Sequence, residues 1–480
     1  MRNQEKLPIV EALRRHTYEN RISMHVPGHK NGRVFPEEGY DLFQSVLPID
    51  VTEITGLDDL HAPEGAIRES EGLLRELYGS LHSFFLVNGT TSGNLAMIMA
   101  ACEEGDVVFV QRNCHKSILH GLMLARVKPV FITPELVEGW GIGGGITQEG
   151  IREALRVHPS PKAVIITCPT YYGTGLDLSQ LVSFCHSHGM LVLADEAHGA
   201  HFTLGAPFPE GAVSAGADIV VQSAHKTLPA MTMGSFLHLN SHRVEKEKLR
   251  FYLQLFQSSS PSYPIMASLD LARRYLADFT VERIRNLSEA VGRFRSDLRS
   301  IEGISVMEGP NLDPLKITLS SNAGVSGYKL QQAFEGQNIY PELADPRNVL
   351  FILPLDAEAI RRESGRVIGG IARSLEDMEP EGVMPDMKDI HLPETISRLE
   401  LSFQEMEKHE IVQHELWEST GQIAGESIIP YPPGIPLLLK GERITQEILT
   451  VLEHYMRLGA RFHGGEGLSE NKIAVFNKLA

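Results

Sequence analysis

The chain has 480 residues, 42% of them hydrophobic, and a formal net charge of −17. A chain of this length is expected to fold into two or three packed units. The acidic balance argues against a nucleic-acid partner and suits a cationic substrate, although solubility alone explains it equally well. No apolar stretch approaches the ~20 residues of a membrane helix, and MRNQEKLPIV at the start lacks the apolar core of a secretory signal. We therefore expect a cytoplasmic protein without membrane contact.

The four cysteines are widely scattered, at Cys102, Cys114, Cys168 and Cys185. Their positions show neither the paired spacing of a metal site nor the density of a disulfide scaffold. We expect them to be buried, reduced thiols.

From about residue 84, short apolar runs alternate with segments of helical length. Strands that are apolar almost throughout and are separated by helices are typical of a parallel sheet covered on both faces. The sequence therefore predicts an α/β fold with a mainly parallel sheet, whose ligands bind beyond the carboxyl ends of the strands. The expected strands are FFLV, VVFVQ, PVFIT, AVIITCP, MLVLADE and DIVVQSAHK.

After residue 264 the pattern changes to apolar residues spaced three and four apart, which predicts a long amphipathic helix. We expect this helix to connect a large domain at 1–300 to a smaller α+β domain at 301–480. The acidic, proline-bearing stretch at 376–394 is typical of a surface linker. The apolar positions of the helix are Ile284, Leu287, Val291, Phe294, Leu298 and Ile301.

Three strand ends carry residues suited to chemistry, and the first is LVNGTTSGN at 86–94. A strand is followed by the hydroxyls of Thr90, Thr91 and Ser92 and then by a helix. Amides at a helix start, together with hydroxyl donors, form a phosphate cradle. Serine and threonine are also ordinary helix N-caps, so the pattern alone does not decide between the two.

The second strand end is MLVLADEAHGAH, where Asp195 directly follows apolar residues. A buried carboxylate is costly unless it meets a cation, so we expect a positive group beside it. A helix cap is one alternative. A metal site built with His198 and His201 is another, but the spacing does not match a zinc site, and we predict no metal.

The third strand end is DIVVQSAHK, which places Ser223, His225 and Lys226 after an apolar run. One cofactor, pyridoxal phosphate, accounts for all three strand ends: its phosphate needs the cradle, its ring nitrogen needs Asp195, and its aldehyde needs Lys226. Burial lowers the pKa of a lysine and so favours the neutral amine that forms a Schiff base. Taken singly, Lys226 could instead be half of an ion pair, and His225 a core histidine.

SAHK after a parallel strand resembles the cofactor attachment site of the ornithine/lysine/arginine decarboxylases, which are pyridoxal-phosphate enzymes of the aspartate aminotransferase fold. The similarity extends over nearly the whole chain. The matching stretches are HVPGHKNG at 25, LDDLHAPEG at 57, NGTTSGN at 88, RNCHKS at 112, DEAHGAH at 195 and YPPGIPLLLKGE at 431.

The resemblance implies roles for individual residues around the cofactor. His115 would stack on one face of the pyridine ring, and Ala197 would pack against the other. Thr90, Thr91 and Ser223 would contact the phosphate, with Ser92 and His198 nearby.

Further roles implied by the resemblance concern catalysis, assembly and substrate. His225 would lie near the reacting carbon, and either it or Lys226 would return a proton there. The segment SSSPSY, which contains Ser259, would reach the phosphate bound by a partner subunit, which implies a homodimer. Glu442 would accept the basic side chain of the substrate, although a solvated turn residue is an equally good interpretation.

The expected reaction is decarboxylation of arginine to agmatine, with lysine and ornithine as alternative substrates. The chain departs from the family pattern at Pro229 and Met233, after the lysine, and at His198, where larger members carry an aromatic ring. An aminotransferase would need an arginine clamp for the substrate carboxylate, and Arg347, Arg361 and Arg366 are available for one. A non-catalytic protein that binds pyridoxal phosphate is the remaining alternative.

Overall fold

The computed structural model describes residues 4–19, 21–376, 378, 395–431, 436–457 and 459–477. The chain folds into two compact units. The first comprises Met1–Ala101, Leu191–Ala206 and Glu210–Thr280, and the second comprises Cys102–Met190, Pro207–Pro209 and Val281–Ala480. The domain boundary expected at residue 300 falls within the second unit and stays a prediction. Nearly all of the expected linker at 376–394 lies outside the described residues.

The strands of the first unit are ordered β1-β9-β8-β7. Strands β7 and β8 are parallel, with Asp195 opposite Val221, so the two strands predicted to end in Asp195 and Lys226 are confirmed as neighbours. Strand β9 is antiparallel to both β8 and β1. The antiparallel pairing of β1 with β9 was not expected. A short segment after Lys226 connects β8 to β9, so β9 runs back antiparallel to β8. The bounds are β1 (His82–Leu86), β7 (Leu191–Asp195), β8 (Ile219–Gln222) and β9 (Ser235–Leu239).

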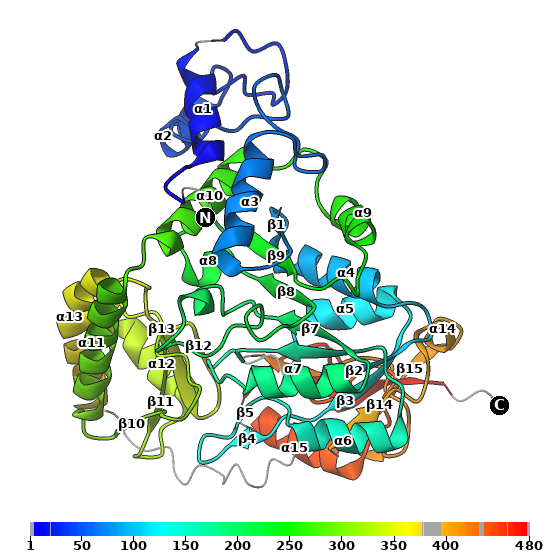
Figure 1. Cartoon of the computed structure of the whole chain (residues 1–480). Coiled ribbons are helices and arrows are strands. Elements are labelled where there is room, and N and C mark those ends of the chain that lie inside the picture. The colour runs from blue at the N-terminus through cyan, green and yellow to red at the C-terminus, as the bar shows by residue number, and fades with distance from the viewer. Residues whose placement is uncertain are drawn as a thin grey trace. The chain divides into compact units, whose positions relative to one another are not determined.

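Helices flank these strands in the first unit (Figure 1). Helix α3 contacts β1, and α1 contacts both α3 and α10. Helix α4 follows β1 directly and packs on β8 and β9. The helices are α1 (Pro8–Tyr18), α2 (Glu37–Phe43), α3 (Ala66–Tyr78), α4 (Gly89–Ala101), α8 (Ala224–Thr227), α9 (Lys246–Phe256) and α10 (Tyr263–Ala277).

The second unit contains the remaining predicted strands, in the order β6-β2-β3-β14. Strand β2 is parallel to both β3 and β6, as expected, whereas β14 adds an antiparallel edge to β3. The elements are β2 (Val107–Gln111), α5 (Lys116–Leu124), β3 (Lys128–Ile132), β4 (Leu136–Val137), β5 (Ile142–Gly143), α6 (Gln148–Val157), β6 (Ala163–Thr167), α7 (Leu178–Ser187) and β14 (Ile396–Arg398).

The long amphipathic helix is confirmed as α11 (Val281–Arg299), which buries Leu287, Val291, Phe294 and Leu298. It lies beside α13 next to an antiparallel sheet ordered β10-β11-β13-β12 (Figure 1). This sheet and its helices form the smaller α+β part that we expected. They are β10 (Ile304–Val306), β11 (Lys316–Ser321), α12 (Gly327–Gly336), β12 (Leu343–Ala344), β13 (Asn348–Ile352) and α13 (Ala357–Glu376).

The last segment of the second unit has its own apolar core, built around Leu416, Leu438, Leu449 and Ile473. Its elements are α14 (Phe403–Met406), β15 (Ile411–Glu415), β16 (Ile429–Tyr431), α15 (Gln446–Arg457), β17 (Arg461–His463) and β18 (Lys472–Phe476). All four cysteines of the chain are buried, and none of them forms a disulfide bond. Among the described residues, no helix combines the length and the apolar character needed to cross a membrane.

Helix α4 approaches the strands closely at Gly93. A Cβ atom added there would lie 2.6 Å from Leu86 Cδ1 and 2.6 Å from Val221 Cγ1, and both side chains are fully buried. Only glycine lets the helix pack this close without moving the core. Gly93 therefore sets the position of the α4 N-terminus, which carries Thr90.

We expect Gly93→Ala to destabilise the protein by about 1–3 kcal/mol through overpacking. The measurement is the urea midpoint of unfolding. Gly292→Ala is the matched control, because Gly292 is an exposed residue within α11 whose added Cβ meets nothing within 4 Å. That control should keep or slightly raise the midpoint. Equal midpoints for Gly93→Ala and wild type would contradict the packing argument.

Candidate functional site

The turn from β1 into α4 brings hydroxyl groups together. Gly89 has a φ of 76°, a conformation that glycine adopts without strain, and its N–H donates to the Met233 carbonyl at 3.0 Å. The buried Thr90 hydroxyl is hydrogen-bonded to the Ser223 hydroxyl and lies 3.0 Å from that of Ser235. Two of these three hydroxyls, those of Thr90 and Ser223, belong to residues that were predicted to contact the phosphate.

The other two predicted cradle residues differ in exposure. Thr91 is exposed, whereas the buried Ser92 donates its hydroxyl proton to the Gly89 carbonyl at 2.8 Å. The backbone N–H groups of this first turn have no partner inside the helix, and the helix dipole adds positive potential. Hydroxyls and amides of this kind suit a phosphate group.

Asp195 ends β7 and is 2% exposed. Its carboxylate accepts hydrogen bonds from Asn94 Nδ2 at 3.0 Å and from the Ala197 N–H at 3.2 Å. Within the described residues, no basic side chain forms an ion pair with it. Because an unpaired buried carboxylate costs several kcal/mol, the site suits a ligand that brings a cation to Asp195.

Lys226 lies in the single turn of α8, directly after β8, and is half-buried. Its Nζ is 3.1 Å from Nε2 of the buried His198. The Ser223 N–H donates to the Ala197 carbonyl at 3.2 Å, which joins the segments after β7 and β8. The two segments carrying Asp195 and Lys226 are thus directly hydrogen-bonded to each other.

His225 is half-buried, and its Nδ1 lies 3.0 Å from the Gly234 carbonyl oxygen. Because a carbonyl only accepts hydrogen bonds, the proton of the neutral ring sits on Nδ1, which leaves a lone pair on Nε2. Burial lowers the pKa of His225 below its ordinary value of 6.5, the hydrogen bond to Gly234 raises it, and the charge of Lys226 lowers it. His225 is therefore neutral at pH 7.

These residues fit pyridoxal phosphate. The hydroxyls of Thr90, Ser223 and Ser235 at the α4 N-terminus suit its phosphate, and the buried Asp195 suits a protonated ring nitrogen. The amine of Lys226 follows the strand beside Asp195 and suits the aldehyde. The site thus offers each chemical group of the cofactor a partner of matching chemistry.

His198 and His201 follow Asp195 closely in the sequence, and a metal site was the alternative interpretation of these three residues. Nε2 of His198 faces the Lys226 amine. Across the part of the chain that the structure describes, no three His, Cys, Asp or Glu side chains are placed to hold a metal ion.

The other predicted site residues are Ser259, His115 and Glu442. Ser259 is exposed in the segment after α9, where the neighbouring Ser258 N–H donates to Asn88 Oδ1 at 3.2 Å. His115 and Glu442 belong to the second unit. His115 is the exposed N-cap of α5 and accepts from the Ser117 N–H at 3.2 Å. The roles of all three residues in binding stay predictions.

Glu442 is 4% exposed and forms a bidentate ion pair with Arg112, which is 0% exposed. Oε1 and Oε2 of Glu442 accept from Nη1 and Nη2 of Arg112 at 2.6 and 2.8 Å. Ser397 Oγ and the Leu439 N–H donate to the same carboxylate at 2.9 Å each. The contacts therefore give Glu442 a structural role within the second unit, beside the substrate role that was predicted.

Sequence reasoning missed Asn94, Ser235 and Arg112. Asn94 lies four residues after Thr90, so helical spacing places both on one face of α4, and this was a usable signal. Ser235 begins β9, whose antiparallel return the sequence did not reveal. Arg112 directly follows the apolar strand β2, in the same way that Asp195 ends β7, but its partner lies 330 residues away.

Comparison with known proteins supplies the family. The model of the Orn/Lys/Arg decarboxylase major domain matches residues 7–309, and that of the C-terminal domain of the same family matches residues 385–466. The uncharacterized protein YaaO of Bacillus subtilis is 44% identical over 477 residues, covering 98% of each chain. The arginine decarboxylase of Bacillus subtilis is 33% identical over 488 residues, covering 99% of each chain.

Solved structures show the same fold. A lysine decarboxylase of Francisella novicida superposes with a TM-score of 0.81 at 23% identity, covering 98% of this chain and 81% of that one. The predicted fold class is confirmed by this likeness.

We expect Glu442→Gln to destabilise the protein by about 3–5 kcal/mol, because it leaves the buried Arg112 guanidinium without its counter-charge. The double variant Arg112→Met, Glu442→Leu removes both charges and should recover most of the loss. Thermal unfolding measures the stability, and KM for the substrate is measured on the same variants. A Glu442→Gln protein with the wild-type unfolding midpoint and a raised KM would contradict the structural role and favour the predicted contact with substrate.

Proposed function

Because this chain belongs to the Orn/Lys/Arg decarboxylase family, we propose that it decarboxylates arginine to agmatine and carbon dioxide, feeding polyamine synthesis. It is a pyridoxal-phosphate enzyme that decarboxylates basic amino acids. The observation that carries the mechanism is the meeting of Asp195, Lys226 and the Thr90 hydroxyl cluster in one unit. The choice of arginine rests on the full-length similarity to an arginine decarboxylase, and the net charge of −17 suits any cationic substrate.

The cofactor, when bound, accepts the electron pair left on the substrate α-carbon as carbon dioxide departs. The chain contributes the groups around it. Asp195 holds a proton on the ring nitrogen, because a buried carboxylate without an ion pair stabilises a cation beside it. Thr90, Ser223 and Ser235 bind the phosphate at the α4 N-terminus.

His198 acts on Lys226. The 3.1 Å separation of its Nε2 from the lysine Nζ fixes the direction of the amine and gives a proton a direct path between the two nitrogens. His198 stands where larger relatives are expected to carry an aromatic ring, so this contact is a feature of the present chain. Its consequence is an amine whose proton can leave without passing through solvent.

His225 returns a proton to the α-carbon after decarboxylation. Its Nδ1–H is held by the Gly234 carbonyl, so Nε2 is the atom that takes up and releases the proton. The lowered pKa keeps Nε2 unprotonated at neutral pH, so Nε2 first takes up a proton from the ammonium form of Lys226 and then passes that proton to the α-carbon. Lys226 is the alternative donor for the same step.

We also propose a cytoplasmic homodimer. Four buried thiols and no disulfide suit a reducing compartment. The exposed Ser259, next to a segment anchored by Asn88, is available to reach the phosphate bound by a partner subunit.

Incubation with arginine, lysine and ornithine separately, followed by mass analysis of the amine, tests the proposed reaction. We expect agmatine from arginine at a kcat/KM at least about tenfold above those for the other two substrates, a difference of about 1.4 kcal/mol in transition-state binding. Lys226→Ala is the control and should lose both the cofactor absorbance and turnover, and borohydride should fix the cofactor on Lys226 of wild type. Cadaverine or putrescine as the main amine would overturn the choice of arginine, and absence of all three amines would overturn the decarboxylase assignment.

The pH dependence of kcat/KM with arginine tests His225. Burial lowers the pKa of the His225 imidazole below 6.5, so the neutral form persists as pH falls through 6.5. We expect activity to decline only below that pH, and we expect His225→Asn to remove this acid limb and lower the rate by about 10²-fold or more. An acid limb centred above pH 6.5 that disappears in His225→Asn would show a raised pKa and contradict the argument.

A further inference from the structure

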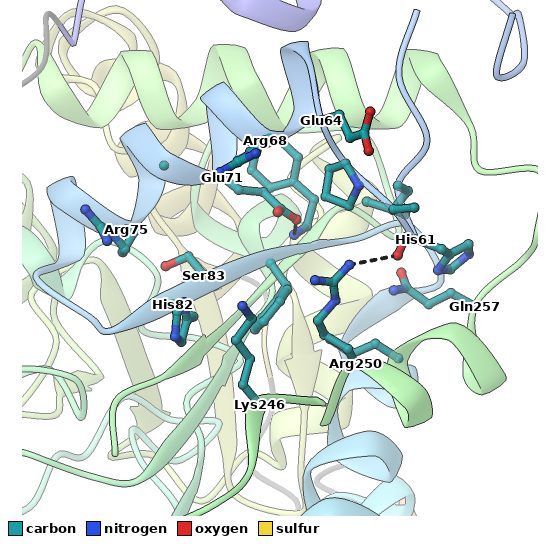
Figure 2. Close-up of a pocket in the computed structure, with 17 residues that line it drawn as sticks. His61, Glu64, Arg68, Glu71, Arg75, His82, Ser83, Lys246, Arg250 and Gln257 are labelled. Carbon is teal, nitrogen blue, oxygen red and sulfur yellow. Dashed lines mark hydrogen bonds between the residues drawn. The ribbon is translucent and has the colours of Figure 1, made fainter. Parts of the chain in front are cut away.

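A cavity of about 610 Å³ lies in the first unit, between α3, β1 and α9 (Figure 2). This volume lies within the range of small-molecule sites. None of the residues that carry the proposed reaction, such as Lys226, Asp195 and Thr90, lines it. The cavity is therefore separate from the site described above.

The cavity walls carry four basic side chains. Arg68 and Arg75 come from α3, and Lys246 and Arg250 come from α9. Figure 2 shows the Lys246 amine and the Arg250 guanidinium directed from α9 toward α3. Arg250 donates to the His61 carbonyl at 3.0 Å, which orients its guanidinium at the cavity edge.

Few carboxylates neutralise these cations. Within the described residues, the ion pairs of Lys246 and Arg75 are loose, with Glu247 at 3.7 Å and Glu76 at 3.9 Å. The exposed Arg68 forms no ion pair with any described residue. Its guanidinium is thus available to a ligand.

Two acidic residues line the cavity, Glu64 and Glu71. Burial raises the pKa of Glu71 to about 8, so this carboxyl is mostly uncharged at pH 7, and one of its oxygens accepts from the Phe85 N–H at 3.1 Å. The pKa of His82 is lowered, first by burial and then by the positive charges of Lys246 and Arg75. The lining is therefore cationic at neutral pH, in a chain whose net charge is −17.

We propose that this cavity binds a small organic anion bearing two or more phosphate groups. Arginine and lysine side chains that converge from two helices can contact several phosphate oxygens at once, and guanidinium groups match phosphate in geometry. Apolar residues in the same lining, Leu60, Phe84 and Leu253, offer a surface for the organic part of the ligand. A cationic amino acid is repelled by this lining, so the ligand differs from the substrate of the proposed reaction.

The cavity adjoins the segment that leads to the cradle. Its lining residue Gln257 accepts from the Val87 N–H at 2.9 Å, two residues before Gly89. Variants that test the cavity must therefore leave β1 and Gln257 intact. Arg68 and Lys246 meet this condition, because in the described part of the chain neither side chain is hydrogen-bonded or ion-paired to β1 or Gln257.

The test is calorimetric titration of the holoenzyme with ADP and with inorganic pyrophosphate, in a buffer free of phosphate. We expect saturable binding of ADP at one site per chain, and weaker binding of pyrophosphate, which lacks the organic part. Arg68→Glu and Lys246→Glu should each weaken binding by about tenfold or more, as loss of a charged hydrogen bond predicts. Arg14→Glu is the matched control, an exposed arginine on α1 outside the cavity, and should bind as wild type does.

Absence of saturable ADP binding to wild type at millimolar concentration would overturn the proposal. Equal affinity of wild type and both cavity variants would overturn it too, because the anion would then bind elsewhere. All variants should keep the cofactor absorbance of wild type, which shows that they are folded. Since the titration contains no amino-acid substrate, its result does not depend on the proposed decarboxylation of arginine.

Discussion

A carboxylate buried without an ion pair governs the arrangement of the site. Asp195 accepts hydrogen bonds from one side-chain amide and one backbone N–H, both of them neutral. It ends strand β7, all of whose residues are buried. Such a charge is costly unless a cation approaches it. The parallel pairing of β7 and β8 places the segment of Lys226 next to it, so one ligand can meet both the carboxylate and the amine. The hydroxyls at the start of α4 then supply the remaining contact.

Other buried carboxylates in the chain show how differently a structural one is satisfied. Asp270 is paired with Arg273 at 3.0 Å and also accepts from the Ser70 hydroxyl and the Ile9 N–H. Asp58 accepts from five backbone N–H groups, between Asp59 and Arg68, at 2.8 to 3.4 Å. Both sites are complete within the chain, and Asp195 has fewer donors than either. The difference supports a functional role for Asp195, independently of any sequence motif.

The sequence predicted the parts of the site that follow from local pattern. Apolar runs located the strands, and the side chains directly after them, Asp195 and Lys226, could be picked out because polar groups are costly there. Contacts between segments that only the tertiary fold brings together could not be predicted in this way. Ser235 joins the hydroxyl cluster only because β9 runs antiparallel to β8, and periodicity is the same for either direction. The Arg112–Glu442 pair joins segments 330 residues apart, and no local signal links them.

Charge is distributed unevenly over the chain, so that the site around Asp195 and the cavity between α3 and α9 favour ligands of opposite charge. The excess of acidic residues draws cations toward the protein at long range, an effect that salt screens beyond about 8 Å under physiological conditions. Short-range contacts then decide which ligand stays. The site around Asp195 carries a buried negative charge, whereas the cavity between α3 and α9 gathers Arg68, Lys246 and Arg250 and holds Glu71 uncharged near neutral pH. The cavity therefore repels a cationic amino acid and suits a phosphate-bearing anion.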